Sequence, residues 1–295
     1  THTQGTSVVV YNPLAIERTD AVDAEIPWKS EWRAVRVLGP DGKDVAAQVV
    51  SVENGNAHIV FAPTVLPLSL ATFDVRPIAA EPGGPRGLKV ADRTLESEFL
   101  RVTIAESGDV ASVFDKAGNR EVLAEPARLA LLYEKPRDWP AWNMDWADRQ
   151  LAPTSFVGQA GDGPAKIAIS ENGRARVAIR VKREHNGSVF TQEIRLAGAG
   201  ERVEFQTHID WNTQERSLKQ AFVLASPNPI ATYDIQAGAI TRGNNSEKRY
   251  ENPSHQWFDL TDISGKFGAS VLSDSKYGSD KPDDKTLRLT LLYTP

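Results

Sequence analysis

The segment RARVAIRVKR, residues 174–183, alternates apolar and basic side chains along most of its length. Successive side chains of a β-strand point to opposite faces, so this alternation gives an extended chain one apolar and one polar face. The apolar face would carry Ala175, Val177, Ile179 and Val181, and the polar face Arg174, Arg176, Arg180 and Lys182. Such a pattern is typical of an antiparallel strand with one face in solvent. The segment therefore predicts a β-sheet protein.

The same period of two recurs along the chain. VEFQTHIDW, residues 203–211, alternates in the same way, and TLRLTLLY, residues 286–293, would align four side chains on one face: Leu287, Leu289, Leu291 and Tyr293. Turn sequences separate such runs at hairpin distance, namely ENG at 53–55 and 171–173 and HNG at 185–187. The sequence contains no convincing amphipathic helix of ten or more residues. We therefore predict the all-β class.

The segment AAEPGGPRG, residues 79–87, concentrates proline and glycine and offers little to bury, which is typical of a connector. We expect a small β-sandwich domain over residues 1–80, a linker over 81–87, and a large domain of two antiparallel sheets over 88–295. The small domain should contain five strands, near residues 7–11, 33–38, 45–52, 57–61 and 71–75.

Composition excludes several classes of protein. The 295 residues are 40% hydrophobic and 25% charged, which is typical of a globular chain. The formal net charge of -5 provides no excess of positive charge that would favour binding to nucleic acid. The absence of cysteine excludes disulfides, thiolate zinc sites and cysteine nucleophiles. No apolar run approaches the roughly 20 residues that span a bilayer, so we expect a soluble protein without a membrane partner, of unknown compartment.

The chain offers no recognisable catalytic motif. It has no GxSxG, HExxH or P-loop sequence. A glycosidase needs two carboxyl groups roughly 5 to 9.5 Å apart, and the sequence leaves six candidates unpaired: Asp138, Asp145, Asp234, Asp259, Asp274 and Glu215. The five histidines lack metal-ligand spacing, and we expect His185, in a turn, and His208, on a polar strand face, to be exposed. We therefore assign no catalytic and no metal-binding residue.

Two polar or aromatic segments could hold a ligand. RDWPAWNMDW, residues 137–146, contains Trp139, Trp142 and Trp146, whose rings could either pin a loop to the sandwich or stack on sugar rings. The segment 240–257 should contain a polar loop of about a dozen residues between strand-like ends, long enough to be functional or disordered, with hydrogen-bond donors for a hydroxyl-rich ligand. SDSKYGSD, residues 273–280, could be a solvated hairpin loop or could lean over a sugar.

Several segments, in this order, resemble glycoside hydrolase family 38, the α-mannosidases. The resemblance rests on LESEFLRVTIAESGDVASVFDKAGNREVL (95–123), RDWPAWNMD (137–145), HIDWNTQERSLKQAF (208–222), ATYDIQAGAITRGNN (231–245), SHQWFDLTD (254–262), GASVLSDSKYGSD (268–280) and LRLTLLYTP (287–295). VVVYNPLAIERTDAV, residues 8–22, resembles the small β domain that follows the family's helical region. The resemblance covers nearly the whole chain.

The resemblance implies a fold and a function. The large domain should be an antiparallel supersandwich like that of galactose mutarotase, truncated at its carboxyl end. In this family an α/β barrel carries the nucleophile, the general acid and the zinc ligands, so zinc is implied for that barrel and no cofactor for this chain. We expect a carboxyl-terminal β region, inactive alone, whose partners are the barrel and helical domain of the same polypeptide and an α-mannoside. The complete enzyme would be a retaining glycosidase.

The resemblance also implies substrate-binding residues. Arg242, Asn244 and Asn245 would contact sugar or the rim of the barrel, and Trp257 and Tyr277 complete the set of candidates. This chain reads RGNNSE, residues 242–247, where many relatives have arginine, proline, threonine, histidine and then asparagine and threonine. It also has Pro140 and Asn143 where relatives tend to have aspartates.

Two other functions stay open at this point. A stand-alone carbohydrate-binding module would act through Trp139, Trp142 or Trp257. An epimerase of the aldose-mutarotase type would need His255 and a facing carboxylate in one groove.

Overall fold

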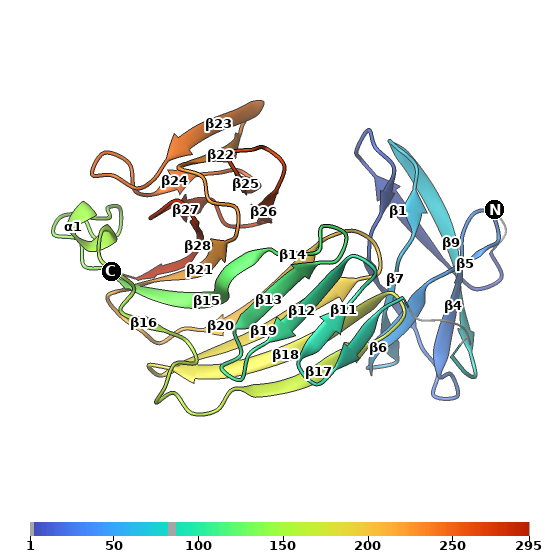
Figure 1. Cartoon of the computed structure of the whole chain (residues 1–295). Helices are drawn as coiled ribbons and strands as arrows, with labels where there is room; N and C mark the ends of the chain where they lie inside the picture. Colours follow the sequence, from blue (N-terminus) through green and yellow to red (C-terminus); the bar gives the residue numbers. More distant parts are fainter. Residues whose placement is uncertain (1–2, 82–86, 295) are drawn as a thin grey trace. The chain divides into compact units, whose positions relative to one another are not determined.

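Strands make up almost all of the regular structure in the computed structural model, which describes residues 3–81 and 87–294 (Figure 1). Within these residues the α-helical structure is confined to α1, the single turn Trp146–Arg149. The prediction of an all-β protein is confirmed. A search of the described residues for a helix of membrane-spanning length and apolarity found none.

The chain divides into two compact units. The first unit comprises Thr1–Leu100, Ile167–Arg180 and Gln192–Gln206, and the second comprises Arg101–Lys166, Val181–Thr191 and Thr207–Pro295. Residues 82–86 of the predicted linker lie outside the described residues. The division into domains at residues 80 and 88 stays a prediction.

The amino-terminal part of the first unit is a small sandwich. One sheet has the order β1 (Thr6–Asn12), β9 (Ser69–Ile78), β4 (Ala34–Leu38) and β5 (Asp44–Val45). The other has the order β3 (Val22–Pro27), β7 (Asn56–Phe61) and β6 (Ala47–Glu53). Val37 and Phe73 of the first sheet share a buried core with Ile59 and Phe61 of the second. This is how two antiparallel sheets cover each other's apolar faces.

The five strands predicted for the small sandwich are all present, and the sequence missed β3 together with the two-residue strands β2 (Arg18–Thr19) and β8 (Thr64–Val65). The ENG turn at 53–55 joins β6 to β7, with Asn54 and Gly55 both at positive φ. That conformation is the one a two-residue hairpin turn requires. The first unit also contains the hairpin of β10 (Lys89–Ala91) and β11 (Thr94–Glu96).

The opening segment lies in β18 (Arg176–His185), in a sheet of order β17 (Lys166–Asn172), β18, β19 (Ser188–Ala197) and β20 (Val203–Asp210). The predicted strand is therefore confirmed, but its polar face is not wholly solvated. Arg176 is buried, 2.9 Å from a carboxylate oxygen of Glu171 and 3.0 Å from one of Asp23. A buried guanidinium needs such partners, because an unpaired buried charge is very costly.

The remaining strands lie mainly in the second unit. One path of paired strands runs β12 (Leu100–Ile104), β13 (Val110–Asp115), β15 (Leu123–Tyr133), β21 (Arg216–Leu224), β28 (Thr286–Thr294), β27 (Gly278–Asp280) and β24 (Asn252–Pro253). β14 (Arg120–Glu121) pairs with β13, and β16 (Ser155–Phe156) with β15. A separate sheet has the order β23 (Gly238–Gly243), β22 (Ile230–Ile235), β25 (Trp257–Thr261) and β26 (Gly268–Leu272).

The central strands β15, β21 and β28 have two different faces. On one face Leu129, Leu131 and Leu218 form a buried core with Val157 and Phe190. The register places a different set on the other face: Arg128 opposite Ala221 and Ala221 opposite Arg288, then Ala130 opposite Lys219 and Lys219 opposite Thr290. We call this second surface the polar face.

A β-bulge in β28 decides where Tyr293 points. Leu218 pairs with Leu292 and the next residue, Lys219, pairs with Thr290, so Leu291 is an extra residue. Tyr293 then pairs with Ser217, two residues before Lys219, and paired residues share a face. Tyr293 therefore joins the polar face. The prediction that it aligns with Leu287 and Leu289 is wrong, because the extra residue reverses the alternation.

Candidate functional site

A pocket of about 440 Å³ opens on the polar face of the second unit. Arg128, Ala221 and Arg288 from the central strands contribute to its lining, as do Trp146 and Phe156. The guanidinium carbon of Arg128 lies 4.1 Å from the centroid of the Phe156 ring. A pocket of this volume, with aromatic rings and several polar groups, is of the size that holds a small ligand. We call it the Arg149 pocket, after a buried arginine in its lining.

A cluster of buried charges lies on the same face, and we call it the Asp280 cluster: Lys219, Glu251, Asp280 and Arg288. The ammonium of Lys219 lies 2.5 Å from Glu251 Oε2 and 3.1 Å from Asp280 Oδ1. Arg288 Nε donates to Asp280 Oδ1 at 2.9 Å, and its Nη2 contacts Oδ2. Thr290 donates to Glu251. Two cations face two carboxylates, so the cluster is neutral.

The electrostatics of Asp280 follow from these contacts. Burial by itself would raise the pKa of the Asp280 carboxyl, but the charges of Lys219 and Arg288 hold it well below its usual range. Asn245 adds a hydrogen bond from Nδ2 to Asp280 Oδ2 at 2.8 Å. Asp280 is therefore ionised at neutral pH, where it pairs with Lys219 and Arg288.

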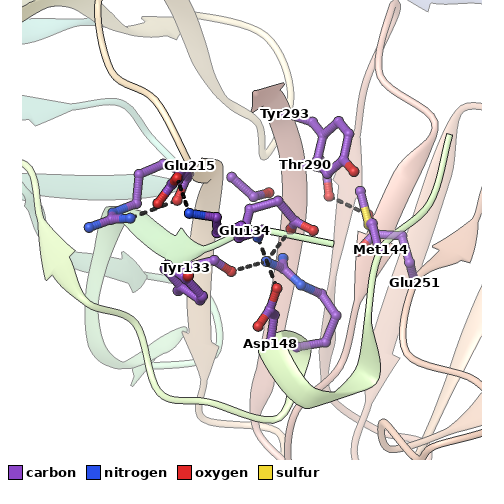
Figure 2. Close-up of polar contacts among 12 residues, drawn as sticks. Tyr133, Glu134, Met144, Asp148, Glu215, Glu251, Thr290 and Tyr293 are labelled. Atoms are coloured by element: carbon purple, nitrogen blue, oxygen red, sulfur yellow. Dashed lines mark hydrogen bonds and ion pairs between the residues drawn. The ribbon is translucent and has the colours of Figure 1, made fainter. Parts of the chain in front are cut away.

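A second buried pair, Glu134 and Arg149, joins the end of β15 to α1. Both side chains are 0% exposed. Arg149 Nη2 contacts a carboxylate oxygen of Glu134 and also donates to the carbonyl of Tyr133 at 2.5 Å. Glu134 lies among the side chains of Asp148, Glu251 and Tyr293 (Figure 2). Burial raises the pKa of Glu134 to about 7, although the charge of Arg149 opposes the shift.

Residues 136–145, which we call the tryptophan loop, carry two exposed indoles. The exposed fraction is 77% for Trp139 and 91% for Trp142. Trp146, just beyond the loop, is half-buried, with its ring centroid 5.5 Å from that of Tyr250. The hypothesis that buried indoles pin this loop is therefore wrong for Trp139 and Trp142.

Tyrosine hydroxyls hold the tryptophan loop in place. Tyr293 donates to the carbonyl of Pro140 at 2.6 Å and contacts the carbonyl of Asn143. Tyr250 donates to the carbonyl of Met144 at 2.6 Å. Burial and the nearby Glu134 raise the pKa of the Tyr293 phenol to about 12, so it stays a hydrogen-bond donor at neutral pH.

Tyr293→Phe should loosen the tryptophan loop without unfolding the protein. One net hydrogen bond contributes about 1 kcal/mol, so we expect roughly fivefold faster hydrogen exchange at the amides of Trp142 and Asn143, which bond to the carbonyl of Trp139. Tyr277→Phe, at an exposed ring, is the control. Equal exchange in the parent and in Tyr293→Phe would show that the hydroxyl does not hold the loop.

The prediction that His185 is exposed is wrong, whereas His208 is exposed as expected. The buried ring of His185 bridges Ser155 Oγ, 2.9 Å from Nε2, and Asp162 Oδ1, 2.7 Å from Nδ1. This is the order of groups in a Ser–His–Asp triad. The backbone N–H groups of residues 156–159 are all hydrogen bonded, however, so they are not free to stabilise an oxyanion. We therefore assign this network a structural role.

A second hollow, of about 490 Å³, lies beside His255 and is lined also by Asp274 and Tyr277. The groove required by the epimerase hypothesis is therefore present. His255 and Asp274 are both exposed, so the hollow provides no sheltered acid and base.

Comparison with known proteins identifies the family. Residues 95–295, more than half of the chain, match the model described as "Glycosyl hydrolases family 38 C-terminal domain". The chain belongs to glycosyl hydrolase family 38. The resemblance found in the sequence is thereby confirmed.

Relatives agree with this family 38 assignment. Alpha-mannosidase G of Dictyostelium discoideum is 28% identical over 281 residues, which cover 86% of this chain and 25% of that protein. Alpha-mannosidase 2C1 of Mus musculus is 31% identical over 211 residues, covering 68% of this chain and 20% of that protein. The chain thus spans about a quarter or less of the length of these relatives.

A solved structure shows that the fold is shared. The crystal structure of a family 38 protein from Enterococcus faecalis superposes with a TM-score of 0.73 at 15% identity, over 98% of this chain and 40% of that chain. At this identity the likeness concerns the fold alone.

The structure distributes the five predicted substrate-binding residues of this family 38 chain over different places. Asn245 lines the Arg149 pocket and Tyr277 lines the hollow beside His255. Arg242, in β23, donates to Asn252 Oδ1 at 3.3 Å, and Trp257 is half-buried in β25. Neither of them, nor Asn244, is in the lining of either pocket. Sugar contact by these residues stays a prediction.

The amides of Asn244 and Asn245 are already engaged within the chain. Asn244 Nδ2 donates to Asp284 Oδ1 at 2.6 Å, and its Oδ1 accepts from the ammonium of Lys281 at 2.5 Å. Asn245 Oδ1 accepts from the backbone N–H of Lys281 at 3.0 Å. These bonds fasten the loop after β23 to the segment after β27, which is a structural task.

Sequence reasoning missed the buried charges. Arg288 lies between Leu287 and Leu289, and Lys219 between Leu218 and Gln220, so both resemble residues on the solvated face of a strand. Asp280 ends the quoted segment 273–280, whose last three residues form strand β27 rather than a loop. The neighbouring residues in the sequence do not indicate whether a polar side chain in a strand will be buried by another part of the fold.

Four of the six candidate carboxylates have partners within the chain. Asp145 and Asp234 accept backbone hydrogen bonds, from Arg137 and Gln256 respectively. Asp259 accepts from Thr261 and Ser270, and Glu215 lies 2.7 Å from the ammonium of Lys135. Among residues 3–81 and 87–294, no group of three or more histidine, aspartate or glutamate side chains could hold a metal ion.

Proposed function

We propose that this chain is the carboxyl-terminal β region of an α-mannosidase-type glycoside hydrolase, where it supports a catalytic barrel and contributes loops to carbohydrate binding. The match of residues 95–295 to the family 38 C-terminal domain carries the proposal, together with relatives named alpha-mannosidases that are about four times as long. The bond-breaking groups would come from another part of the same polypeptide.

The buried charges support a scaffold role. In the Asp280 cluster every charged group is paired with a group of opposite sign. These pairs connect strands β21, β27 and β28, which is a structural role and not one in substrate binding. The bonds of Asn244 and Asn245 then fix the loop that follows β23. Rigid strands carrying fixed loops are the arrangement in which a second domain can complete a binding site.

The proposed reaction of the whole enzyme is retaining hydrolysis. A carboxylate attacks the anomeric carbon while a general acid protonates the leaving oxygen, and water then hydrolyses the glycosyl ester. This chain would bound the sugar site from one side. Its contribution would be to exclude water and orient the sugar through loops such as 242–247.

The epimerase alternative has less support. It needs an acid and a base that the protein tunes, and His255 and Asp274 lie in solvent. Family membership also favours hydrolysis of glycosidic bonds over epimerisation.

The test compares this chain with a longer polypeptide in which it follows its proposed barrel. The purified chain should release no 4-nitrophenol from 4-nitrophenyl α-mannoside above the buffer background, whereas the longer polypeptide should hydrolyse it. The β-mannoside is the control substrate. Hydrolysis by the chain alone, or a longer polypeptide inactive on α-mannosides, would overturn the proposal.

A further inference from the structure

We propose that Trp139 and Trp142 form a carbohydrate-binding platform that this domain carries on its own surface. The identity of the sugar, an α-mannoside, rests on the function proposed above, whereas the binding itself requires no hydrolysis. Exposure, fixed loop geometry and the size of the surface carry the inference.

Exposure is the first observation. Trp139 and Trp142 are the most exposed tryptophans of the described chain, and only two residues separate them. Tryptophan is ordinarily buried to a large extent, and two bulky apolar rings in solvent on one short loop call for a ligand. Both indoles are also absent from the lining of the Arg149 pocket, so the platform is a separate surface.

Fixed geometry is the second observation. Trp139 has φ of 55°, a left-handed conformation that bulky residues adopt only where the surrounding structure enforces it. Its carbonyl accepts from the N–H groups of Trp142 and Asn143 at 2.8 and 2.9 Å. At the two ends of the loop, the N–H of Arg137 donates to Asp145 Oδ2 at 2.8 Å. These bonds fix the backbone that carries both indoles, which lowers the entropic cost of ordering the loop when a ligand binds.

The size of the surface selects the ligand. Two indoles offer about 300 to 500 Å² when both are covered, whereas a stable protein interface buries about 800 Å² on each partner. A ligand of one or two sugar rings therefore matches the area of the two indoles alone, whereas a protein partner would have to contact a much larger surface around them. The apolar C–H face of a sugar ring matches the face of an indole, and sugar hydroxyls stay in solvent at the edges.

Charge near the platform favours a neutral ligand. Arg137 and Asp138 immediately precede Trp139 and are both exposed. Their opposite charges offset each other, so the platform has no net attraction for an anion or a cation. They also provide one donor group and one acceptor group for hydroxyls. A neutral mannoside satisfies all of these conditions.

The experiment titrates the purified chain with α-1,2-mannobiose by isothermal titration calorimetry and by tryptophan fluorescence. An open platform without an enclosing pocket should bind with a dissociation constant on the order of 1 mM. Trp142→Ala and Trp139→Ala should each weaken binding by about tenfold or more, because a few aromatic residues usually carry most of the binding energy. Ile263→Ala, at another exposed apolar side chain of the second unit, is the matched control.

Each outcome decides the proposal. Both indoles are exposed, so their replacement should leave urea unfolding unchanged, and this is measured in parallel. Saturable binding that Trp139→Ala and Trp142→Ala weaken supports the platform. The absence of binding at 20-fold the expected constant of about 1 mM, or binding that neither substitution weakens, overturns it. If the chain binds the sugar but the longer polypeptide fails the hydrolysis test, the platform stands and the proposed enzyme falls.

Discussion

Asp280→Asn should destabilise the protein by about 3–5 kcal/mol at pH 7, the cost of removing one partner of a buried ion pair. The substitution keeps the shape of the side chain but leaves Lys219, fully buried, and Arg288 with Glu251 as the remaining carboxylate of the cluster. Urea unfolding followed by tryptophan fluorescence measures the change.

The matched control is Asp274→Asn, in the same eight-residue segment but exposed. Surface substitutions of this kind usually change stability by less than about 0.5 kcal/mol. Equal unfolding midpoints for Asp280→Asn and Asp274→Asn would contradict the structural role of the cluster.

The effect of Asp280→Asn should depend on pH in a defined direction. The folded pKa of Asp280 lies below its unfolded value, so the stabilisation is fully present above about pH 4, the pKa of an unperturbed aspartate. It is lost as the pH falls below that value toward the folded pKa. The difference in stability between parent and variant should therefore shrink in acid. A difference that grows below pH 4 would mean that the carboxyl is not ionised in the native protein.

Between pH 4.5 and pH 8, the loss of folding free energy should be about 3 kcal/mol smaller in Glu134→Gln than in the parent. The pKa of Glu134 rises from 4.5 to about 7 in the folded protein, and each unit is equivalent to about 1.4 kcal/mol. A carboxyl with a raised folded pKa favours folding most below its unfolded pKa, because the folded state binds the proton more tightly. Its contribution falls as the pH rises from about 4.5 to 7 and is then constant.

The measurement is the free energy of unfolding at pH 4.5 and at pH 8. Part of the loss of stability that the parent shows over this range should be absent from Glu134→Gln. The slope is diagnostic, whereas the stability at a single pH is not, because the variant also leaves Arg149 buried without its counter-ion. Glu125→Gln, at an exposed position of β15, is the control. Parallel pH profiles in the parent and in Glu134→Gln would refute the assignment.

The two predictions bear on the proposed scaffold role in different ways. The Asp280 cluster holds the strands of the polar face together at any neutral pH, whereas the Glu134–Arg149 pair joins β15 to α1 and so positions the tryptophan loop. A change of pH near 7 would act on the second contact and spare the first. One pH titration can therefore follow both sugar binding at the platform and the stability of the tryptophan loop.

The candidate site was only partly predictable from the sequence. The segment 240–257 and the tryptophan-rich stretch stand out in the sequence because their composition departs from that of the neighbouring strands. Which side chains face a cavity was not predictable. Asn245 lines the Arg149 pocket while its neighbour Asn244 does not, although a local pattern treats the two amides alike.

The sequence by itself determined most of the strands, two of the three predicted hairpin turns and the family, since alternation and turn chemistry are properties of a few consecutive residues. The third turn, predicted at residues 171–173, is wrong because Glu171 and Asn172 belong to strand β17. Asn54 and Gly55 specify their turn without help from the rest of the chain. Tertiary structure alone decided which polar strand positions are buried, as at Lys219 and Arg176, because another layer must cover them first. It also decided, through one extra residue in β28, that Tyr293 turns to the polar face and holds the loop that carries Trp139 and Trp142.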